Sequence, residues 1–336
     1  MKVCMIGVRG HWGYAVESLP ELPRVSVAGV SAGCAEDDPG ALVTRCEELG
    51  HRPSVFDDCR KMLDDLHPDV VVIAGPFELH AKMAIDAMER GAHVFCEKPV
   101  ALTMEGLERL RKAHAGSGVR LAGMMGLRYD PAFHTAWRAV KDGAVGRVRM
   151  VNTRKSYKLG ERPSHYRIRA TYGGTIPWVG SHAIDWLMWF SGESFVSVHS
   201  VHTAMENRGN GDMEMTALCQ FALTNDVFGS VSMDFLRPAT APTHGDDRVR
   251  VAGTNGVIEV RDGSTFLING QAEGEQELPV SCERKIFRDF VESIQGGNEC
   301  LVGSEETFEL TRACLLARQS ADEGRIVEFQ GWRQRG

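Results

Sequence analysis

Short apolar runs and amphipathic stretches alternate over the first 125 residues of the chain. Apolar, often β-branched runs that suit buried strands occupy residues 2–7, 24–31, 69–75, 92–99 and 119–125. Stretches with helical periodicity lie between them at residues 40–50, 78–91 and 103–116, and a shorter one carries Ala15, Val16 and Leu19. This regular β–α alternation predicts an α/β domain with a parallel, doubly wound sheet.

The pattern changes in the second half of the chain. Strand-like runs cover residues 147–157, 194–204, 214–223, 227–235 and 248–253, and short turns of Gly, Asn and Asp join several of them. The segment "HAIDWLMWFSG", which begins at His182, is apolar on nearly every face and predicts a buried helix. A chain of 336 residues is long enough for two domains, and we expect them at residues 1–125 and 126–336.

Composition and charge exclude several classes of partner. The chain is 43% hydrophobic and 25% charged, with a net charge of −7, so we expect it to bind neither nucleic acid nor an anionic membrane. No apolar run approaches the roughly 20 residues that span a bilayer, and the first residues do not resemble a signal peptide. The nine cysteines form no CxxC pair, which favours reduced thiols and a cytoplasmic location.

A glycine-rich turn follows the first predicted strand. It reads Gly7-Val8-Arg9-Gly10-His11-Trp12-Gly13, where a chain that leaves a strand and enters a helix can bring its backbone close to a pyrophosphate. The spacing is GxxGxxG and not GxGxxG, with Arg9 where the second glycine is expected. The turn therefore predicts a dinucleotide site, although glycines also serve tight β–α turns that bind nothing.

The end of the second predicted strand bears on the choice between NAD and NADP. An NAD-preferring site usually has an acidic residue there for the ribose hydroxyls, but this chain has Ser31. A hydroxyl does not repel a 2′-phosphate and Arg9 could approach one, so the pattern favours NADP slightly. In the alternative, an acid of the following loop, Glu36, Asp37 or Asp38, contacts the ribose instead.

Several motifs in a fixed order resemble one family of oxidoreductases. They are "GPFELH" (75–80), "FCEKPV" (95–100), "RYDPAF" (128–133), "GGTIPWVGSHAID" (173–185) and "VAGTNGVIEV" (251–260). Together they resemble the Gfo/Idh/MocA family, whose members include glucose–fructose oxidoreductase and inositol dehydrogenase. The resemblance implies an N-terminal Rossmann domain and a C-terminal α/β domain with a large open, mostly antiparallel sheet. It also implies a homodimer or homotetramer formed through that sheet.

The resemblance further implies an NAD(P)-dependent dehydrogenase or reductase acting on a hydroxyl or carbonyl carbon of a sugar, sugar acid or cyclitol. The catalytic residues that it assigns are Lys98 of the Glu-Lys-Pro motif and His182. The residues that it assigns to the cofactor are Gly7, Arg9, Gly10, His11, Trp12, Ser31, Gly75, Pro76, His80, Glu97, Lys98 and Arg128. Those that it assigns to the substrate are Lys98, Tyr157, Trp178 and His182.

Local chemistry gives reasons for the two catalytic assignments. Oxidation of a hydroxyl needs a group that takes its proton, and Lys98 follows a predicted buried strand at the sheet edge where such folds bind ligands. Alternatively, Lys98 is an ordinary surface lysine in the loop after a strand. His182 and Asp185 share one helix face, so Asp185 is expected to support the helix or orient His182. The alternatives for His182 are a structural role and a metal site, but further ligands at suitable spacing are missing.

Trp178 departs from the family pattern, because many members have an Asp four residues before the histidine. An indole accepts no hydrogen bond. It could form an apolar wall of a sugar site, mark lost or altered chemistry, or simply pack beside Pro177. Two rival functions therefore stay open: a redox-neutral, NAD-dependent glycoside hydrolase, and a non-catalytic cofactor-binding sensor.

A basic cluster could bear on the substrate. Residues 147–172 contain eight cationic side chains against the single acid Glu161. By resemblance this segment borders the substrate, which favours an anionic or polyhydroxylated molecule such as a sugar acid. The alternative is a solvated strand face or a contact between subunits. The eight cations are Arg147, Arg149, Arg154, Lys155, Lys158, Arg162, Arg167 and Arg169.

Overall fold

The structure is a computed structural model that describes residues 1–329. It divides into two compact units: unit 1 contains Met1–Gly126 and Arg284–Thr311, and unit 2 contains Leu127–Glu283 and residues 312–329. Residues 284–311 therefore pack with unit 1 although they follow most of unit 2 in sequence. The division into domains 1–125 and 126–336 stays a prediction.

Unit 1 is built on a six-stranded parallel sheet with the strand order β3-β2-β1-β4-β5-β6. This order confirms the doubly wound sheet, and its direction reverses between β1 and β4. All four residues of β4 are buried, as its continuous apolar run predicts. The strands are β1 (Lys2–Ile6), β2 (Ser26–Ser31), β3 (Ser54–Phe56), β4 (Val70–Ile73), β5 (His93–Cys96) and β6 (Leu121–Gly123).

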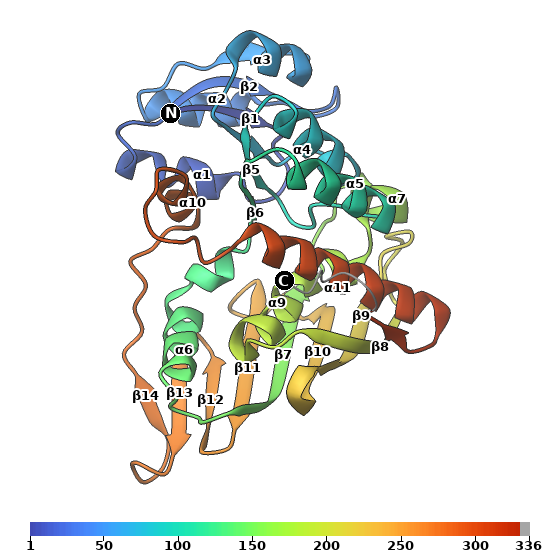
Figure 1. Cartoon of the computed structure of the whole chain (residues 1–336). Helices are drawn as coiled ribbons and strands as arrows, with labels where there is room; N and C mark the ends of the chain where they lie inside the picture. Colours follow the sequence, from blue (N-terminus) through green and yellow to red (C-terminus); the bar gives the residue numbers. More distant parts are fainter. Residues whose placement is uncertain (330–336) are drawn as a thin grey trace. The chain divides into compact units, whose positions relative to one another are not determined.

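Helices α2, α4 and α5 of unit 1 begin and end close to the predicted ranges, whereas α3, α10 and the short strand β3 were not predicted. The helix expected at Ala15, Val16 and Leu19 is shorter than its pattern suggests. The stretch after the glycine-rich turn forms only a four-residue α1 and then a separate 3₁₀ turn that contains Pro20, since proline lacks the N–H that would continue an α-helix. Figure 1 shows these elements along the chain. They are α1 (Gly13–Val16), α2 (Gly40–Glu48), α3 (Cys59–Leu66), α4 (His80–Met88), α5 (Met104–Ala115) and α10 (Ile286–Ile294), with 3₁₀ turns η1 (Leu19–Glu21) and η2 (Phe77–Leu79).

Unit 2 is built on a nine-stranded sheet with the order β14-β13-β12-β11-β7-β10-β9-β8-β15. Among the strands of this sheet that lie within residues 1–329, only β7 and β10 pair in parallel, which confirms a mostly antiparallel sheet. The strands are β7 (Val148–Lys158), β8 (Phe195–Thr203), β9 (Thr216–Leu223), β10 (Val227–Arg237), β11 (Gly245–Gly253), β12 (Gly256–Arg261), β13 (Ser264–Asn269), β14 (Gln276–Leu278) and β15 (Val327–Glu328).

Helices α6 (Pro131–Lys141) and α9 (Gly180–Ser191) pack on this sheet, and Figure 1 shows both lying against its strands. Trp186 of α9 lies under the Lys155 ammonium of β7 and stacks on Phe133 of α6, so odd-numbered residues of β7 face these helices. The opposite face carries exposed apolar side chains, among them Met150 and its register partner Phe228. We call this opposite face the open face.

The remaining helical elements connect or flank the sheet of unit 2. They are η3 (Gly126–Tyr129), η4 (Ser164–Arg167), α7 (Arg169–Tyr172), α8 (Thr175–Trp178), η5 (Thr224–Asp226) and the long α11 (Ser304–Glu323), whose residues are divided between the two units. Of all the helices within residues 1–329, none has the length and apolar character to cross a membrane.

Candidate active site

In unit 1 the glycine-rich turn lies where the order of the parallel strands reverses. Gly7 has φ +88° and its N–H donates to Ser31 O at 2.8 Å, while a Cβ on Gly7 would overlap Gly75, the glycine that follows β4. Glycine is therefore required at this close approach of two strand exits. At such a reversal, ligands of doubly wound folds bind beyond the carboxyl ends of the strands.

Glu97 of the Glu-Lys-Pro motif ties the turn to the end of β5. The carboxylate is fully buried and accepts from the His11 N–H at 2.5 Å, pairs with His11 Nδ1 at 2.8 Å, and accepts from the Lys98 N–H at 2.9 Å. Burial alone would raise the pKa of Glu97, but His11 and Lys98 outweigh it and lower the pKa below its ordinary value. Gly10 is needed here because a Cβ would overlap this carboxylate. Glu97 thus holds the glycine turn against Lys98.

Arg9 is engaged by an acid of the loop after β2. Its Nε donates to Asp37 Oδ2 at 2.6 Å and its Nη2 to Asp37 Oδ1 at 3.0 Å, and both side chains are 15% exposed. Ser31 is completely buried, with its Oγ 3.5 Å from the Gly33 N–H. A carboxylate therefore stands beside Arg9 even though the end of β2 itself carries a serine.

The other residues assigned to the cofactor hold the loops of unit 1 or line its surface. His80 is fully buried with Nδ1 2.9 Å from Pro99 O and Nε2 3.0 Å from Gly75 O, so it links the loops after β4 and β5. Burial lowers the pKa of this imidazole. Pro76 is buried just before η2, and Trp12 lines a hollow between α1 and α2.

In unit 2, His182 occupies the first turn of α9 and is 4% exposed, and Trp178 ends the short α8 at 8% exposed. Asp185, one turn after His182, forms a buried two-bond ion pair with Arg128: Nε to Oδ2 at 2.8 Å and Nη2 to Oδ1 at 2.6 Å. This pair favours the supporting role predicted for Asp185. It also places the guanidinium of Arg128, which we assigned to the cofactor, against α9 at 5.5 Å from the Trp189 ring.

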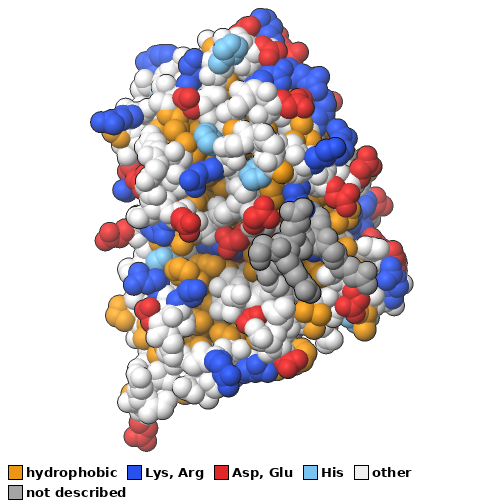
Figure 2. All heavy atoms as spheres, viewed as in Figure 1, with side chains coloured by type: hydrophobic (Ala, Val, Ile, Leu, Met, Phe, Trp, Pro, Cys, Tyr) orange, Lys and Arg blue, Asp and Glu red, His pale blue; other side chains and the backbone are white. Residues whose placement is uncertain are grey.

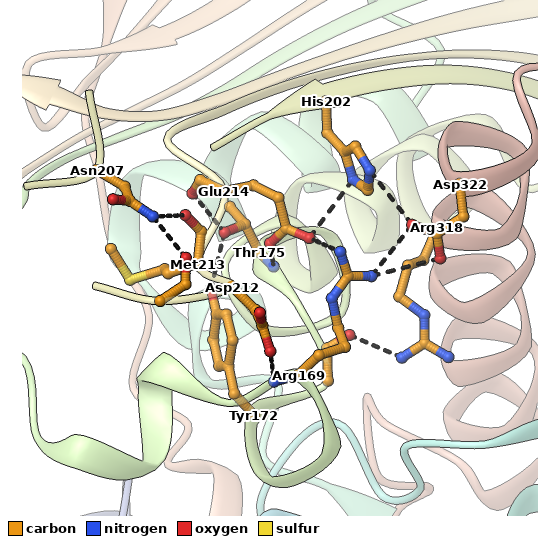
Figure 3. Close-up of polar contacts among 12 residues, drawn as sticks. Arg169, Tyr172, Thr175, His202, Asn207, Asp212, Met213, Glu214, Arg318 and Asp322 are labelled. Carbon is orange, nitrogen blue, oxygen red and sulfur yellow. Dashed lines mark hydrogen bonds and ion pairs between the residues drawn. The ribbon is translucent and has the colours of Figure 1, made fainter. Parts of the chain in front are cut away.

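A buried acid that the sequence did not single out fixes the turn that leads to Trp178. Glu214 lies just before β9, accepts from the Thr175 N–H at 2.8 Å through Oε2, and its carbonyl accepts from Thr175 Oγ1 at 2.7 Å. Its other carboxylate oxygen faces Arg169 and lies 3.5 Å from His202 Nδ1. Figure 3 shows Glu214 between Thr175, Arg169 and His202. The network anchors the Gly-Gly-Thr turn, and through it α8.

Tyr157 near the end of β7 lines a cavity of about 610 Å³ in unit 2. Its ring lies 4.8 Å from Lys155 Nζ and 5.1 Å from the His244 ring, and burial raises the pKa of the phenol. Lys155 is 1% exposed and bonds Asp247 of β11 at 2.5 Å. The structure therefore brings Tyr157, Lys155 and Asp247 together on the sheet face that α9 covers.

The basic cluster does not form one cationic surface. Arg154 pairs with Asp246 and lines a hollow on the open face, whereas Arg169 pairs with Glu214 and Asp322. Figure 2 shows Lys and Arg interspersed with Asp and Glu over the visible face of the molecule. These pairs give no support to the predicted anionic substrate, which stays a prediction.

Within residues 1–329 the structure contains no group of three or more His, Cys, Asp or Glu side chains arranged to hold a metal ion. The residues that sequence reasoning missed, Glu214, Asp247 and the buried role of Lys155, share one property. Each is a charged residue on or beside a strand. Such a residue needs a partner when its strand face is buried, but the sequence does not say which face or which partner.

The chain matches known proteins along most of its length. Residues 1–124 match the oxidoreductase family with an NAD-binding Rossmann fold, and residues 133–259 match the GFO/IDH/MocA C-terminal domain. A solved Thermotoga maritima structure, provisionally described as an oxidoreductase, is 44% identical with a TM-score of 0.94 over 98% of this chain and 100% of that one.

Two named relatives are similar at lower identity. D-xylose 1-dehydrogenase (NADP(+)) 2 of Haloferax volcanii is 25% identical over 97% of this chain and 99% of its own. Inositol 2-dehydrogenase of Burkholderia multivorans is 26% identical over 86% of this chain and 83% of its own. All of these matches agree with the resemblance inferred from the sequence.

Proposed function

Because the chain belongs to the Gfo/Idh/MocA oxidoreductase family, we propose that it transfers a hydride between a nicotinamide cofactor and a hydroxyl or carbonyl carbon of a sugar, sugar acid or cyclitol. The observation that carries this proposal is the glycine turn at the reversal of the parallel sheet, tied by Glu97 to Lys98. Residues 1–125 form the cofactor domain in this proposal, and residues 126–336 bind substrate and form the oligomer.

The turn fits a dinucleotide. Gly7 and Gly75 bring the exits of β1 and β4 together without side chains between them, as the close approach of a pyrophosphate requires. The nicotinamide, when bound, supplies or accepts the hydride. The proposed contacts come from the ends of the strands and the glycine turn, while His80 and Arg128 act by holding the loops and α9. The fully buried Ser31 and Glu97 act by holding the glycine turn. The proposed contacting residues are Gly7, Arg9, Gly10, His11, Trp12, Asp37, Gly75, Pro76 and Lys98.

The pair between Arg9 and Asp37 favours NAD over NADP, in contrast to the preference suggested by Ser31. A 2′-phosphate near Arg9 would compete with a carboxylate that already holds two of its N–H groups, and the two anions repel. The ribose hydroxyls of NAD instead donate to carboxylates. Asp37 therefore takes the part of the acid that is missing at the end of β2.

Lys98 and His182 handle the proton of the reacting hydroxyl. Lys98 is 5% exposed beside the buried carboxylate of Glu97, and its ammonium donates to the hydroxyl oxygen and stabilises charge that develops there. His182 is a buried imidazole on a helix clamped by Arg128 and Asp185, which suits a general base of fixed orientation.

Trp178 shapes the substrate site as an apolar wall. It is 8% exposed, and its ring lies 5.8 Å from Tyr166. An indole cannot replace a carboxylate as a hydrogen-bond acceptor, so hydroxyl recognition must come from other side chains. The names of the xylose and inositol relatives support a polyhydroxylated substrate.

The open face of the unit 2 sheet is the surface for a homodimer or homotetramer. Its side chains Met150, Val201, Leu218 and Phe228 are 44%, 52%, 43% and 53% exposed. Val201 and Leu218 are register partners, as are Met150 and Phe228, so they form two apolar cross-strand pairs. Apolar side chains grouped on one face are typical of a protein–protein interface.

The test is a fluorescence titration of the full chain with NADH and NADPH, followed by a turnover assay with NAD and a panel of polyols. The proposal predicts binding of NADH and reduction of free NAD by at least one uncharged polyol or sugar acid. If the cofactor stays bound and is never consumed while a sugar is hydrolysed, the protein is the redox-neutral hydrolase. Binding without turnover would identify the sensor, and no binding at all would overturn the proposal.

A further inference from the structure

The cavity beside Tyr157 contains the carboxylate of Asp247, which is not among the residues proposed for the cofactor or for proton transfer. The cavity lies wholly in unit 2 and is lined by Phe133, Tyr157, Arg237, Gly245 and Asp247, among others. Asp247 is the register partner of Lys155, and the two form the ion pair described above. Its side chain is 22% exposed, so part of this carboxylate reaches the cavity.

One oxygen of this carboxylate has no hydrogen-bond donor. Oδ2 is bonded to the Lys155 ammonium, whereas Oδ1 is buried and receives no hydrogen bond from the residues that the structure describes. An acceptor left without a donor in a buried place costs free energy. The terminal torsion of an Asp side chain is soft, so the carboxylate can turn Oδ1 toward a donor that enters the cavity.

Gly245 keeps the space in front of this carboxylate open. A Cβ on Gly245 would lie 2.7 Å from Tyr157 Cε1 and 3.7 Å from Asp247 Oδ1. The first distance is too short for a real contact, so a side chain here would displace the Tyr157 ring or fill the cavity beside it. The glycine thus leaves the edge of the Tyr157 ring open and keeps a side chain out of the space beside Asp247.

The charges around the cavity favour an uncharged ligand. Arg237 is the cation among the lining side chains, but it faces Asp246 at 3.6 Å and donates to Thr243. The lining also includes Asp130, Asp246, Asp247 and Asp262. An anionic ligand would be repelled by these carboxylates, because like charges oppose binding. The Arg237 guanidinium would not offset this repulsion, since it already faces Asp246.

We propose that Asp247 binds a hydroxyl group of an uncharged polyhydroxylated ring in this cavity, with Lys155 compensating the charge of the carboxylate. The site is linked to the proposed catalytic helix, because Lys155 Nζ lies 5.7 Å from the ring of Trp186, which follows His182 by one turn on α9. In this proposal a hydroxyl-binding carboxylate comes from β11, at Asp247. This inference rests on the proposed function and narrows its substrate class from sugar acids to neutral sugars and cyclitols.

The experiment measures binding of three probes, myo-inositol, D-xylose and D-xylonate, to the full chain by saturation-transfer NMR titration, with an NADH titration of each variant. Loss of a hydrogen bond to a charged group predicts that Asp247→Asn binds myo-inositol or D-xylose about ten- to a hundredfold more weakly. Gly245→Ala leaves the ion pair intact and should also weaken binding. D-xylonate should bind more weakly than D-xylose, and NADH affinity should not change.

The matched control is Asp234→Asn. Asp234 is a carboxylate of the same sheet that is bonded to Ser156 on the opposite face, and it is not among the residues lining the cavity. The Asp234→Asn variant should change polyol affinity by less than about twofold. If Asp247→Asn unfolds because Lys155 loses its partner, Gly245→Ala decides the question.

Equal binding by Gly245→Ala and wild type, tighter binding of D-xylonate than of D-xylose, or no binding of either neutral probe would overturn the inference. The NADH titration keeps the two proposals apart. Polyol binding that depends on Asp247 in a chain that binds no NADH would leave this inference standing and remove the proposed function.

Discussion

The choice between NAD and NADP can be tested through Asp37. Replacing it by serine frees the two N–H groups of Arg9 that the carboxylate now holds at 2.6 and 3.0 Å. At 4 Å and an effective dielectric constant of 20 the charge pair is worth about 4 kcal/mol before competing hydration. The net value of a hydrogen bond to a charged group is about 1.5–3 kcal/mol. The Asp37→Ser variant should therefore shift the NADPH-to-NADH affinity ratio by about ten- to a hundredfold toward NADPH.

The assay is a pair of fluorescence titrations with NADH and NADPH for each variant. Asp38→Asn is the control, because Asp38 is the neighbouring acid and caps Gly40 without contacting Arg9; it should leave the ratio within about twofold. Adding Arg9→Met to Asp37→Ser should cancel the shift of the affinity ratio toward NADPH. A ratio that stays within about twofold of wild type in Asp37→Ser would refute the assignment of Arg9 and Asp37 to the ribose site.

Three further predictions follow from buried charges. Arg128→Met should lower the free energy of unfolding by about 3–5 kcal/mol in a denaturant titration, and adding Asp185→Leu should recover part of it; an unchanged free energy would contradict the buried pair. Glu214→Ala should lower turnover while NADH affinity is kept, with Glu214→Gln recovering some of it through the Thr175 N–H; equal loss in both variants would contradict this anchoring role. Because the pKa of Glu97 is lowered on folding, it stabilises the fold above its unfolded pKa of about 4.3. That contribution is lost as pH falls through the folded value, so Glu97→Gln should make the acid side of the stability profile shallower.

The parallel sheet of unit 1 could be predicted because each of its main strands is a short apolar run followed by a helix signal. This strand pattern also predicted that Lys98 and the glycine turn lie at the same edge of the sheet, since the carboxyl ends of parallel strands share an edge. It failed at α1, where periodicity suggested a longer helix but Pro20 ends it. Because proline cannot continue a helix, Pro20 in the sequence already indicated that this helix would be short.

The partners of the charged residues could not be predicted in the same way. Arg9 lies 28 residues from Asp37, Arg128 lies 57 from Asp185, and Lys155 lies 92 from Asp247. Such pairs depend on strand register and loop paths, which a hydrophobic pattern does not contain. For the same reason the basic cluster looked like one feature in the sequence, although Arg154 and Lys155 of β7 point to opposite faces of the sheet and Arg169 lies outside it.

The most direct test of the account is the steady-state rate of NAD reduction by the Lys98→Met variant on a polyol that the wild type oxidises, with NADH affinity measured in parallel. We predict a fall in kcat of about 10²–10⁴-fold, the usual contribution of a positioned acid–base group. NADH affinity should fall by much less, about tenfold at most, through loss of the proposed cofactor contact of Lys98. Undiminished turnover in Lys98→Met, or a wild type that binds NADH but oxidises no polyol, would contradict the central claim that this chain is a dehydrogenase with Lys98 at its reacting centre.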